Sequence, residues 1–175
     1  MRYIYDKAFV LRRVNFGDSD RYITLFSEEH GKIEVVAKGV RKITSRRAPS
    51  VELLNLIDFQ AVRTSKNYIL TETRLISSNE KLKRDLANIQ KAFSMCELVD
   101  AVMPLGVRHS DVFVLMEKAV EHVSESNKNM AYFQAKLLTL LGFWDARTSF
   151  KNADHVANYV EQIIERKLKS ASVFV

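Results

Sequence analysis

The sequence predicts an α+β protein in which a small β-barrel of five strands precedes an all-α helical domain. Two observations support this prediction. Between residues 3 and 76, five segments show the alternation of apolar and polar side chains that is typical of β-strands. From residue 77 onward, apolar residues recur at intervals of three and four, which is the spacing of one face of an α-helix. The change of period predicts two domains, residues 1–78 and 79–175.

The first three strands are expected in the first forty residues. A long strand is predicted over residues 3–14, and the corner at 16–18 ends it. A hairpin follows, because residues 22–26 and 33–37 both alternate and the tight turn at 28–31 joins them.

Two further strands are predicted over residues 53–63 and 68–76. Between them lies a turn at 65–67, in which Asn67 is able to take a left-handed conformation. Pro49 precedes the fourth strand, in a connection where it interrupts no ladder. Five short strands with a long connection between the third and the fourth suggest a closed barrel of the oligonucleotide-binding (OB) type.

Four helices are predicted in the second domain. The first begins at a capping box formed by Ser77 and Glu80. The residues expected on its buried face are Leu82, Leu86, Ile89, Phe93, Cys96, Val99 and Met103.

The remaining three helices have their own start and stop signals. Ser110 caps the second, and residues 129–141 form the third, with the glycine that follows as its C-terminal cap. Asn152 or Asp154 begins the fourth. An extended tail is expected at 173–175.

Composition narrows the classes of function. The net charge of +6 and the pI of about 9.4 favour an anionic partner, such as nucleic acid or an acidic protein segment. With Cys96 as the one cysteine, neither an internal disulfide nor a cysteine-rich zinc site is expected, which fits a reducing, cytoplasmic setting. No segment has the run of about eighteen apolar residues that a membrane span needs.

No arrangement typical of catalysis is apparent, so an enzyme is not expected. The four histidines, His30, His109, His122 and His155, include no pair at metal-ligand spacing. Cys96 is expected to be a core thiol, because it lies on an apolar helix face. We therefore predict no catalytic residue, no metal site and no cofactor.

A basic run follows the hairpin. No acidic residue occurs between Glu34 and Glu52, whereas five cations fall within ten residues. Such a run is typical of a surface that binds a phosphate backbone, although a solvated loop is the alternative. The five cations are Lys38, Arg41, Lys42, Arg46 and Arg47.

A succession of short motifs resembles the bacterial recombination mediators of the RecO family. The motifs are Gly17-Asp-Ser-Asp-Arg21, His30-Gly-Lys32, Ala37-Lys-Gly-Val-Arg-Lys42, Ser45-Arg46, Leu82-Lys-Arg-Asp-Leu86, Glu97-Leu-Val-Asp100 and Leu140-Leu-Gly-Phe143. Their order and spacing match the family over roughly residues 5–145. The resemblance implies an OB-fold barrel followed by a helical domain.

The resemblance also implies a function. Members of the family bind single- and double-stranded DNA, anneal complementary strands coated by single-strand-binding protein, and work with RecR to load RecA. None is an established enzyme. By position, the basic run falls where the barrel of the family meets DNA, and Arg21 and Lys32 match the pattern and extend the predicted patch.

The sequence departs from the family pattern in one place. Many members carry a four-cysteine zinc module just after the Leu-Gly-aromatic turn, but residues 144–152 contain no cysteine. The chain therefore looks like a short form that lacks the zinc module.

The resemblance further implies that the helical domain receives the acidic, phenylalanine-ended tail of single-strand-binding protein. Such a tail needs an apolar slot and basic groups. We expect Phe133, Leu137 and Trp144 to line the slot, with Lys136 and Arg147 at its rim. The alternative, which helical spacing favours, is that the aromatics are core residues and the cations are solvated.

Two other functions fit the same sequence. One is a protein-interaction adaptor in which the basic loop is incidental. The other is an RNA-binding module, because exposed aromatics such as Tyr22 and Phe26 stack on the bases of either nucleic acid.

Overall fold

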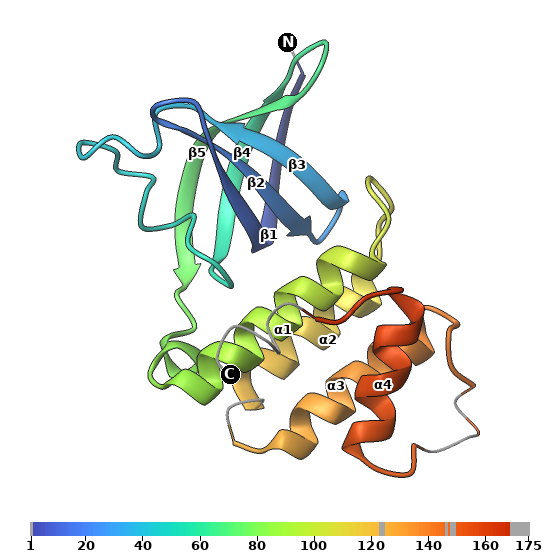
Figure 1. Ribbon diagram of the computed structural model, residues 1–175. Helices are drawn as coiled ribbons and strands as arrows, with labels where there is room; N and C mark the ends of the chain where they lie inside the picture. The colour runs from blue at the N-terminus through green and yellow to red at the C-terminus, as the bar shows by residue number, and fades with distance from the viewer. Residues whose placement is uncertain (1, 123–124, 146, 148–149, 169–175) are drawn as a thin grey trace. The chain divides into compact units, whose positions relative to one another are not determined.

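The computed structural model contains a five-stranded sheet followed by four α-helices, as the sequence predicts (Figure 1). The chain divides into two compact units. The first, here the barrel unit, comprises Met1–Asn79 and Val102–His109, and the second, here the helical unit, comprises Glu80–Ala101 and Ser110–Val175. The structure describes residues 2–122, 125–145, 147 and 150–168.

The sheet of the barrel unit closes on itself in the order β1-β2-β3-β5-β4. All neighbouring strands are antiparallel except β3 and β5, whose short parallel pairing joins Val35 and Val36 to Tyr68 and Ile69. This seam is therefore the briefest of the barrel. The strands are β1 (Arg2–Phe16), β2 (Asp20–Ser27), β3 (Gly31–Ala37), β4 (Leu56–Arg63) and β5 (Tyr68–Ser77).

The barrel core is built from alternate residues of every strand, such as Ile23 and Leu25 of β2 and Ile57 and Phe59 of β4. The alternation of β1 is not regular. The register of β1 against β2 shifts between Val10 and Arg12, so the alternation changes phase. Val14, which would share a face with Val10 in a regular strand, is consequently 47% exposed whereas Val10 is buried.

Two backbone predictions near β4 are wrong. The strand begins at Leu56 and not at residue 53, because Leu54 adopts a φ of +61°, which lies outside the β region that a non-glycine strand residue requires. In the following turn, Asn67 is not among the residues with positive φ. Thr64 instead organises the turn, since its Oγ accepts from Asn67 N at 3.0 Å and donates to Asn67 O at 2.7 Å.

A buried carboxylate fixes the turn between β2 and β3. Asp6 accepts hydrogen bonds from the Ser27 hydroxyl and from Glu29 N at 2.9 Å, and its carboxylate lies 2.9 Å from His30 Nδ1. Burial raises the pKa of Asp6, but these hydrogen bonds and one from Lys7 N outweigh it, and the pKa lies below its ordinary value. The carboxylate therefore stays ionised and holds the turn against β1.

A segment from outside the five strands completes the barrel unit. Leu105 forms a parallel bridge with Lys32 of β3, and Gly106 N donates to Lys32 O at 2.8 Å. Arg108 forms an ion pair with Glu29 at 2.7 Å. The loop 102–109 thus pairs with the start of β3, an association that the predicted boundary after residue 78 did not include.

The first α-helix begins later than predicted. Ser77 is the last residue of β5, and its hydroxyl is bonded to Asn79, so it forms no capping box. A 3-10 turn (Glu80–Lys83) precedes α1 (Leu86–Val102), whose first turn is capped by Asp85, which accepts from Asn88 N at 2.9 Å. The predicted buried face is correspondingly wrong in part: Cys96 and Val99 are buried, but Leu86 and Phe93 are 56% and 42% exposed.

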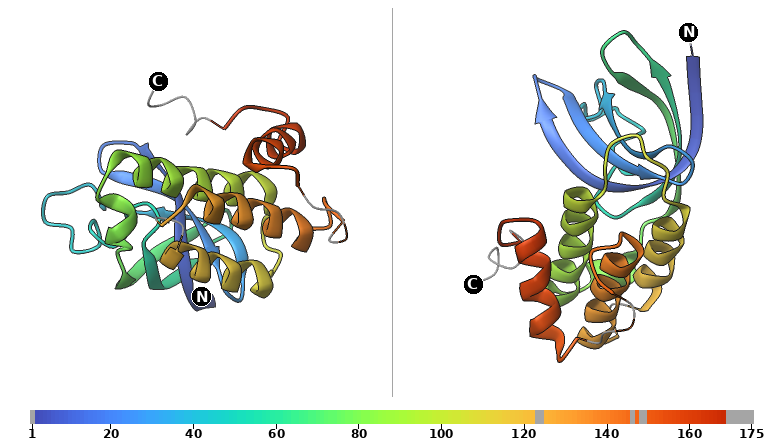
Figure 2. Two further views of the ribbon diagram at one scale, coloured as in Figure 1. Left: turned by 90° about the horizontal axis from the view of Figure 1, so that it is seen from below. Right: turned by 90° about the vertical axis from the view of Figure 1, so that its right-hand side faces the viewer.

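The other helices are α2 (Ser110–His122), α3 (Asn127–Leu140) and α4 (Ala153–Ile163). The helices of this unit lie alongside one another, and α3 packs against both α2 and α4 (Figure 2). Gly142 ends α3 with a φ of +76°, and Asn152 caps α4 by accepting from His155 N at 2.8 Å, both as predicted. The predicted tail at 173–175 lies outside the described residues.

Candidate nucleic-acid interface

The basic run forms the first part of the long connection from β3 to β4, which extends away from the barrel in Figure 1. Its start is tied to the turn between β1 and β2. Gly39 N donates to the Asp20 carboxylate at 2.7 Å, and Arg41 N donates to Ser19 O at 2.9 Å. The Arg41 guanidinium also donates to Gly17 O at 3.1 Å. Asp20 therefore anchors the start of the basic loop to this turn.

Three cations of the run are exposed and make no ion pair within the part of the chain that the structure describes: Lys38, Lys42 and Arg46. Arg41 is also exposed, and its hydrogen bond to a carbonyl leaves its charge uncompensated. These four side chains give the loop exposed positive charges that form no ion pair within the described residues, although Asp20 accepts from Gly39 at its start. Such exposed cations are the electrostatic requirement for binding phosphates.

Arg47, the fifth predicted contact, has a structural position. Its guanidinium donates to Lys38 O at 2.7 Å, to Leu70 O at 2.5 Å and to Thr71 O at 3.4 Å. It therefore links the end of β3 to β5 across the brief seam of the barrel. No sequence pattern indicates this role, because the partners are backbone carbonyls, two of them more than twenty residues further along the chain.

Of the two residues predicted to extend the patch, Arg21 lies beside its start and Lys32 lies apart from it. Arg21 is in register with Ala37, the neighbour of Lys38, and it donates to Asn15 Oδ1 at 3.2 Å and lies 3.5 Å from Glu52. Glu52 also pairs with Arg13, so one carboxylate is shared by two arginines. Lys32 is at the opposite end of β3 from Lys38, about 20 Å away along the strand, beside the loop 102–109.

An exposed aromatic pair lies beside the basic loop. Phe16 at the end of β1 and Tyr22 of β2 are 48% and 38% exposed, and their ring centroids are 4.6 Å apart. Tyr22 is in register with Val14 and Val36, so it points out from the barrel. Phe26, which the sequence suggested as a second exposed aromatic, is completely buried.

The sequence did not single out Phe16 as a site residue, because it falls at a predicted corner. An aromatic residue at the end of a strand and close to a basic loop could nevertheless have indicated a nucleic-acid contact. We call the combined region the loop surface. It consists of Phe16, Tyr22, Lys38, Arg41, Lys42 and Arg46.

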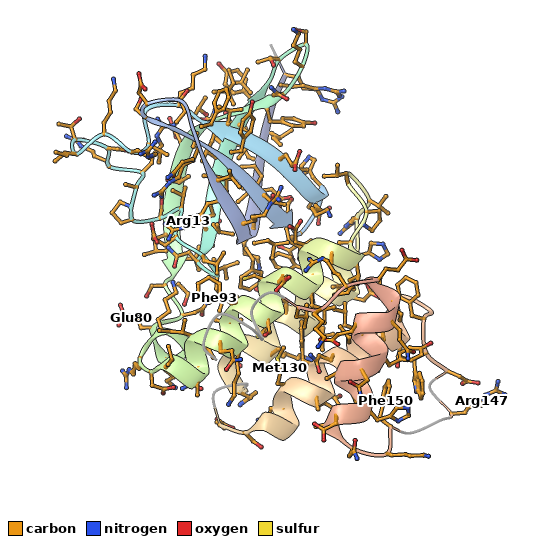
Figure 3. The ribbon with its side chains drawn as sticks, viewed as in Figure 1. Arg13, Glu80, Phe93, Met130, Arg147 and Phe150 are labelled. Carbon is orange, nitrogen blue, oxygen red and sulfur yellow. The ribbon has the colours of Figure 1, made fainter. Side chains whose placement is uncertain are left out.

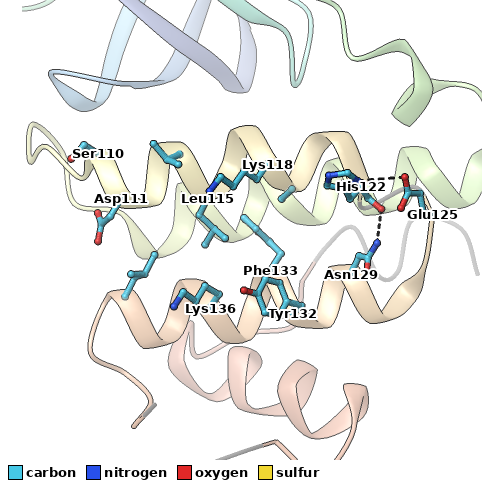
Figure 4. A pocket seen from close by; sticks show the side chains of 13 residues that line it. Ser110, Asp111, Leu115, Lys118, His122, Glu125, Asn129, Tyr132, Phe133 and Lys136 are labelled. Carbon is cyan, nitrogen blue, oxygen red and sulfur yellow. Dashed lines mark hydrogen bonds and ion pairs between the residues drawn. The ribbon is translucent and has the colours of Figure 1, made fainter. Parts of the chain in front are cut away.

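The helical unit contains an open groove of about 850 Å³ between α2 and α3 (Figure 4). Val114, Leu115 and Tyr132 are among its apolar lining residues, and Tyr132 is 66% exposed. Lys118 from α2 and Lys136 from α3 are exposed cations of the same groove. The groove therefore combines apolar area with two positive charges from facing helices, and the carboxylates of Asp111 and Glu125 also line it.

The five residues predicted to form a partner slot do not come together. Phe133 and Lys136 line this groove, but Leu137 is completely buried. Trp144 stacks on Phe150 with ring centroids 4.0 Å apart. Arg147 is bonded to the neighbouring Asp145 in a turn that extends away from the helices (Figure 3).

Within the described part of the chain, no group of three or more potential ligands could hold a metal ion. Ser27, Asp6 and His30 are close together, but the Ser27 hydroxyl donates to Asp6 and not to His30. They therefore lack the nucleophile–base hydrogen bond of a hydrolase. None of the described helices has the length and apolar character to cross a membrane.

Comparison with known proteins relates these features to one family. Residues 1–79 match the family model described as Recombination protein O N terminal. The chain is 30% identical over 140 residues to the DNA repair protein RecO of Symbiobacterium thermophilum, which covers 78% of this chain and 55% of that protein. The RecO of Heliobacterium modesticaldum is 33% identical over 147 residues, covering 82% and 53% respectively. The chain spans little more than half the length of these curated relatives.

Proposed function

The chain belongs to the RecO family of DNA repair proteins, and from this premise we propose that it is a recombination mediator that binds single- and double-stranded DNA through its loop surface. The observation that carries the proposal is the exposed pair of Phe16 and Tyr22 beside four exposed, unneutralised cations. Bases stack on aromatic rings, and phosphates bind Lys and Arg, so both halves of a nucleotide find a partner there.

We further infer that the barrel is an OB fold. A five-stranded barrel in which β1 pairs with both β2 and β4, and β3 closes against β5, has the Greek-key character of that fold. In OB folds the face of strands 2 and 3, with the loops between strands 1 and 2 and between strands 4 and 5, binds oligonucleotides. Tyr22 occupies this face, and the basic loop adjoins it.

The family resemblance extends the proposal to a pathway of repair. The protein would anneal complementary strands coated by single-strand-binding protein, and with RecR it would help load RecA, which it meets indirectly. This role requires holding DNA and partner proteins, with no bond-breaking step and no cofactor. It places the protein in the cytoplasm, at the nucleoid.

The proposal is tested by the salt dependence of DNA binding. A variant with Lys38, Lys42 and Arg46 replaced by alanine should bind any DNA sequence more weakly. Because each lost phosphate contact removes about 0.7 from the log–log salt slope on single strands, the slope should fall by about 2. Titrations at several salt concentrations measure it, with DNA and RNA of equal length compared in parallel.

The matched control replaces Lys81, Arg84 and Lys151 with alanine, which removes the same net charge from exposed positions of the helical unit. Its slope should equal that of the wild type. If both triple variants lose the same slope, the binding is a response to net charge, and the loop surface is not the interface. Stronger binding to RNA than to DNA would favour the RNA-binding alternative.

We also propose that the groove between α2 and α3 receives the acidic, phenylalanine-ended tail of single-strand-binding protein. The groove offers apolar side chains for the ring, and Lys118 and Lys136 for carboxylates. This location replaces the slot predicted from the sequence, of which only Phe133 and Lys136 belong to the groove.

Titration of a labelled tail peptide tests this location. Lys118→Glu combined with Lys136→Glu should weaken binding at least tenfold, because two attractions become repulsions. Arg147→Glu makes the same kind of change outside the groove and should leave the affinity unaltered. Removal of the terminal phenylalanine should weaken binding to the wild type. If the wild type does not bind at low salt, the partner is wrong, whereas unaltered binding to the double variant rejects the location.

A further inference from the structure

A groove of about 490 Å³, here the hairpin groove, lies within the barrel unit between the start of β3, the loop 102–109 and the turn 64–67 that joins β4 to β5. It occurs beside the brief seam of the barrel, because β3 pairs with β5 only at Val35 and Val36. Ahead of this pairing, β3 is bonded at Lys32 to the loop 102–109, and the turn 64–67 lines the same space. The groove is large enough for a ligand of the size of a nucleotide.

Three cations of the described structure line the hairpin groove: Lys32 of β3, Arg63 at the end of β4 and Lys66 in the turn. Arg63 and Lys66 are exposed, and neither forms an ion pair among the described residues. The Arg63 guanidinium lies 6.0 Å from the centroid of the Tyr68 ring, within the range of a cation–π contact, and Tyr68 packs against the barrel core. This contact orients the guanidinium at the groove in the absence of a ligand.

Two carboxylates line the same groove, and each has a basic partner that does not line it. Glu29 forms an ion pair with Arg108 at 2.7 Å, and Glu34 lies 3.6 Å from Arg12. The cations of the lining therefore outnumber its acids, and both acids are already compensated. The charge balance of the hairpin groove favours an anionic ligand.

His30 adds a hydrogen-bonding group whose orientation is fixed. Its Nδ1 lies 2.9 Å from the Asp6 carboxylate, which is ionised and can only accept, so Nδ1 carries the proton and donates. The other ring nitrogen, Nε2, remains for a ligand, and His30 is part of the lining. Ser65 and Asn67 of the turn add further polar groups. The groove thus offers both positive charge and hydrogen-bonding partners.

We propose that the hairpin groove binds a phosphate monoester of nucleotide size, either the 5′-phosphorylated end of a DNA strand or a free nucleotide. A phosphate monoester carries a charge of about −1.5 to −2 at pH 7, whereas each phosphodiester within a strand carries one negative charge. The more negative group gains more from a lining in which cations outnumber compensated acids. Arg63 also presents the planar fork that binds two phosphate oxygens at once.

The hairpin groove is separate from the loop surface. Lys32 and Lys38 lie at opposite ends of β3, about 20 Å apart along the strand. The loop surface binds the phosphates within a strand, and the hairpin groove adds a preference for its phosphorylated end. Recognition of a strand end rests on the proposed function, whereas recognition of a free nucleotide does not.

Thymidine 5′-monophosphate and unphosphorylated thymidine are the probes that isolate the contribution of the phosphate. Each is titrated into the full chain at low salt while the amide NMR signals are followed. We expect the monophosphate to shift the signals of Asn67 and Gly106, which border the groove on two sides. It should bind at least about tenfold more tightly than thymidine, because it adds a charge that several cations attract.

The variant Arg63→Gln, Lys66→Gln should lose this preference. The matched control Arg2→Gln, Lys81→Gln removes the same charge from exposed positions outside the lining and should keep it. Thermal melting verifies that both variants are folded. If the groove variant retains the preference for the monophosphate, or if the wild type has none for any phosphorylated probe, the hairpin groove is rejected as a phosphate site.

A six-nucleotide oligothymidylate with and without a 5′-phosphate separates the two sources of the monoester. A preference for the phosphorylated strand that disappears in the groove variant assigns the site to strand ends. Equal binding of the two strands, with thymidine 5′-monophosphate still preferred over thymidine, assigns it to a free nucleotide. Binding of the unphosphorylated strand reports on the proposed function independently, which fails only if no strand binds.

Discussion

Gly31→Ala is expected to lower the free energy of unfolding by about 3–5 kcal/mol, because two costs combine at this position. Gly31 has a φ of +66°, a left-handed conformation that costs an L-residue about 1–2 kcal/mol. In addition, a Cβ atom would lie 1.9 Å from Val107 O, which is a backbone atom that cannot move alone. The loop 102–109 would have to leave β3, and the Gly106–Lys32 hydrogen bond and the Arg108–Glu29 ion pair would be lost.

Gly17→Ala separates these two costs. Gly17 has a similar φ of +56°, but a Cβ there meets nothing within 4 Å. Its substitution should therefore cost only the conformational part, about 1–2 kcal/mol. Urea denaturation of both variants gives the comparison. Equal losses would mean that the contact between Gly31 and Val107 contributes nothing to stability.

The sequence predicted the elements well where the signal is local. Alternation located all five strands, and the helix signals at Gly142 and Asn152 correctly gave the end of α3 and the start of α4. Two of the wrong predictions have a non-local cause. The shift at Leu11 depends on the pairing of β1 with β2, and the contact of the loop 102–109 with β3 joins residues about seventy positions apart.

The candidate site follows the same division. The basic run and Tyr22 were visible from the sequence, because charge and alternation are local properties. The sequence did not show that the run divides into exposed cations and one structural arginine. Arg47 bonds to backbone carbonyls of β5, and no sequence pattern identifies these partners. Likewise, the groove between α2 and α3 depends on which residues of two helices face each other, so Lys118 was not expected there.

We therefore expect Arg47 to contribute to the stability of the fold, whereas its neighbour Arg46 contributes to DNA binding. The Arg47 guanidinium joins Lys38 O to Leu70 O and Thr71 O, across the seam where β3 and β5 share only a short parallel pairing. Hydrogen bonds to a charged group contribute about 1.5–3 kcal/mol each when fully formed. We expect Arg47→Ala to lower the free energy of unfolding by about 2–4 kcal/mol, and Arg46→Ala, which is at an exposed position, to change it by less than about 0.5 kcal/mol.

Arg47→Lys distinguishes the geometry of the guanidinium from its charge. Lysine keeps the positive charge, but its single ammonium cannot reach three carbonyls in the fixed geometry of the guanidinium fork. Stability should therefore fall nearly as far as in Arg47→Ala, while the salt slope of DNA binding, measured where the variant is folded, stays that of the wild type. Arg46→Lys should change neither quantity. If Arg47→Lys is as stable as the wild type and Arg47→Ala reduces the salt slope by about 0.7, Arg47 binds phosphate and does not close the barrel.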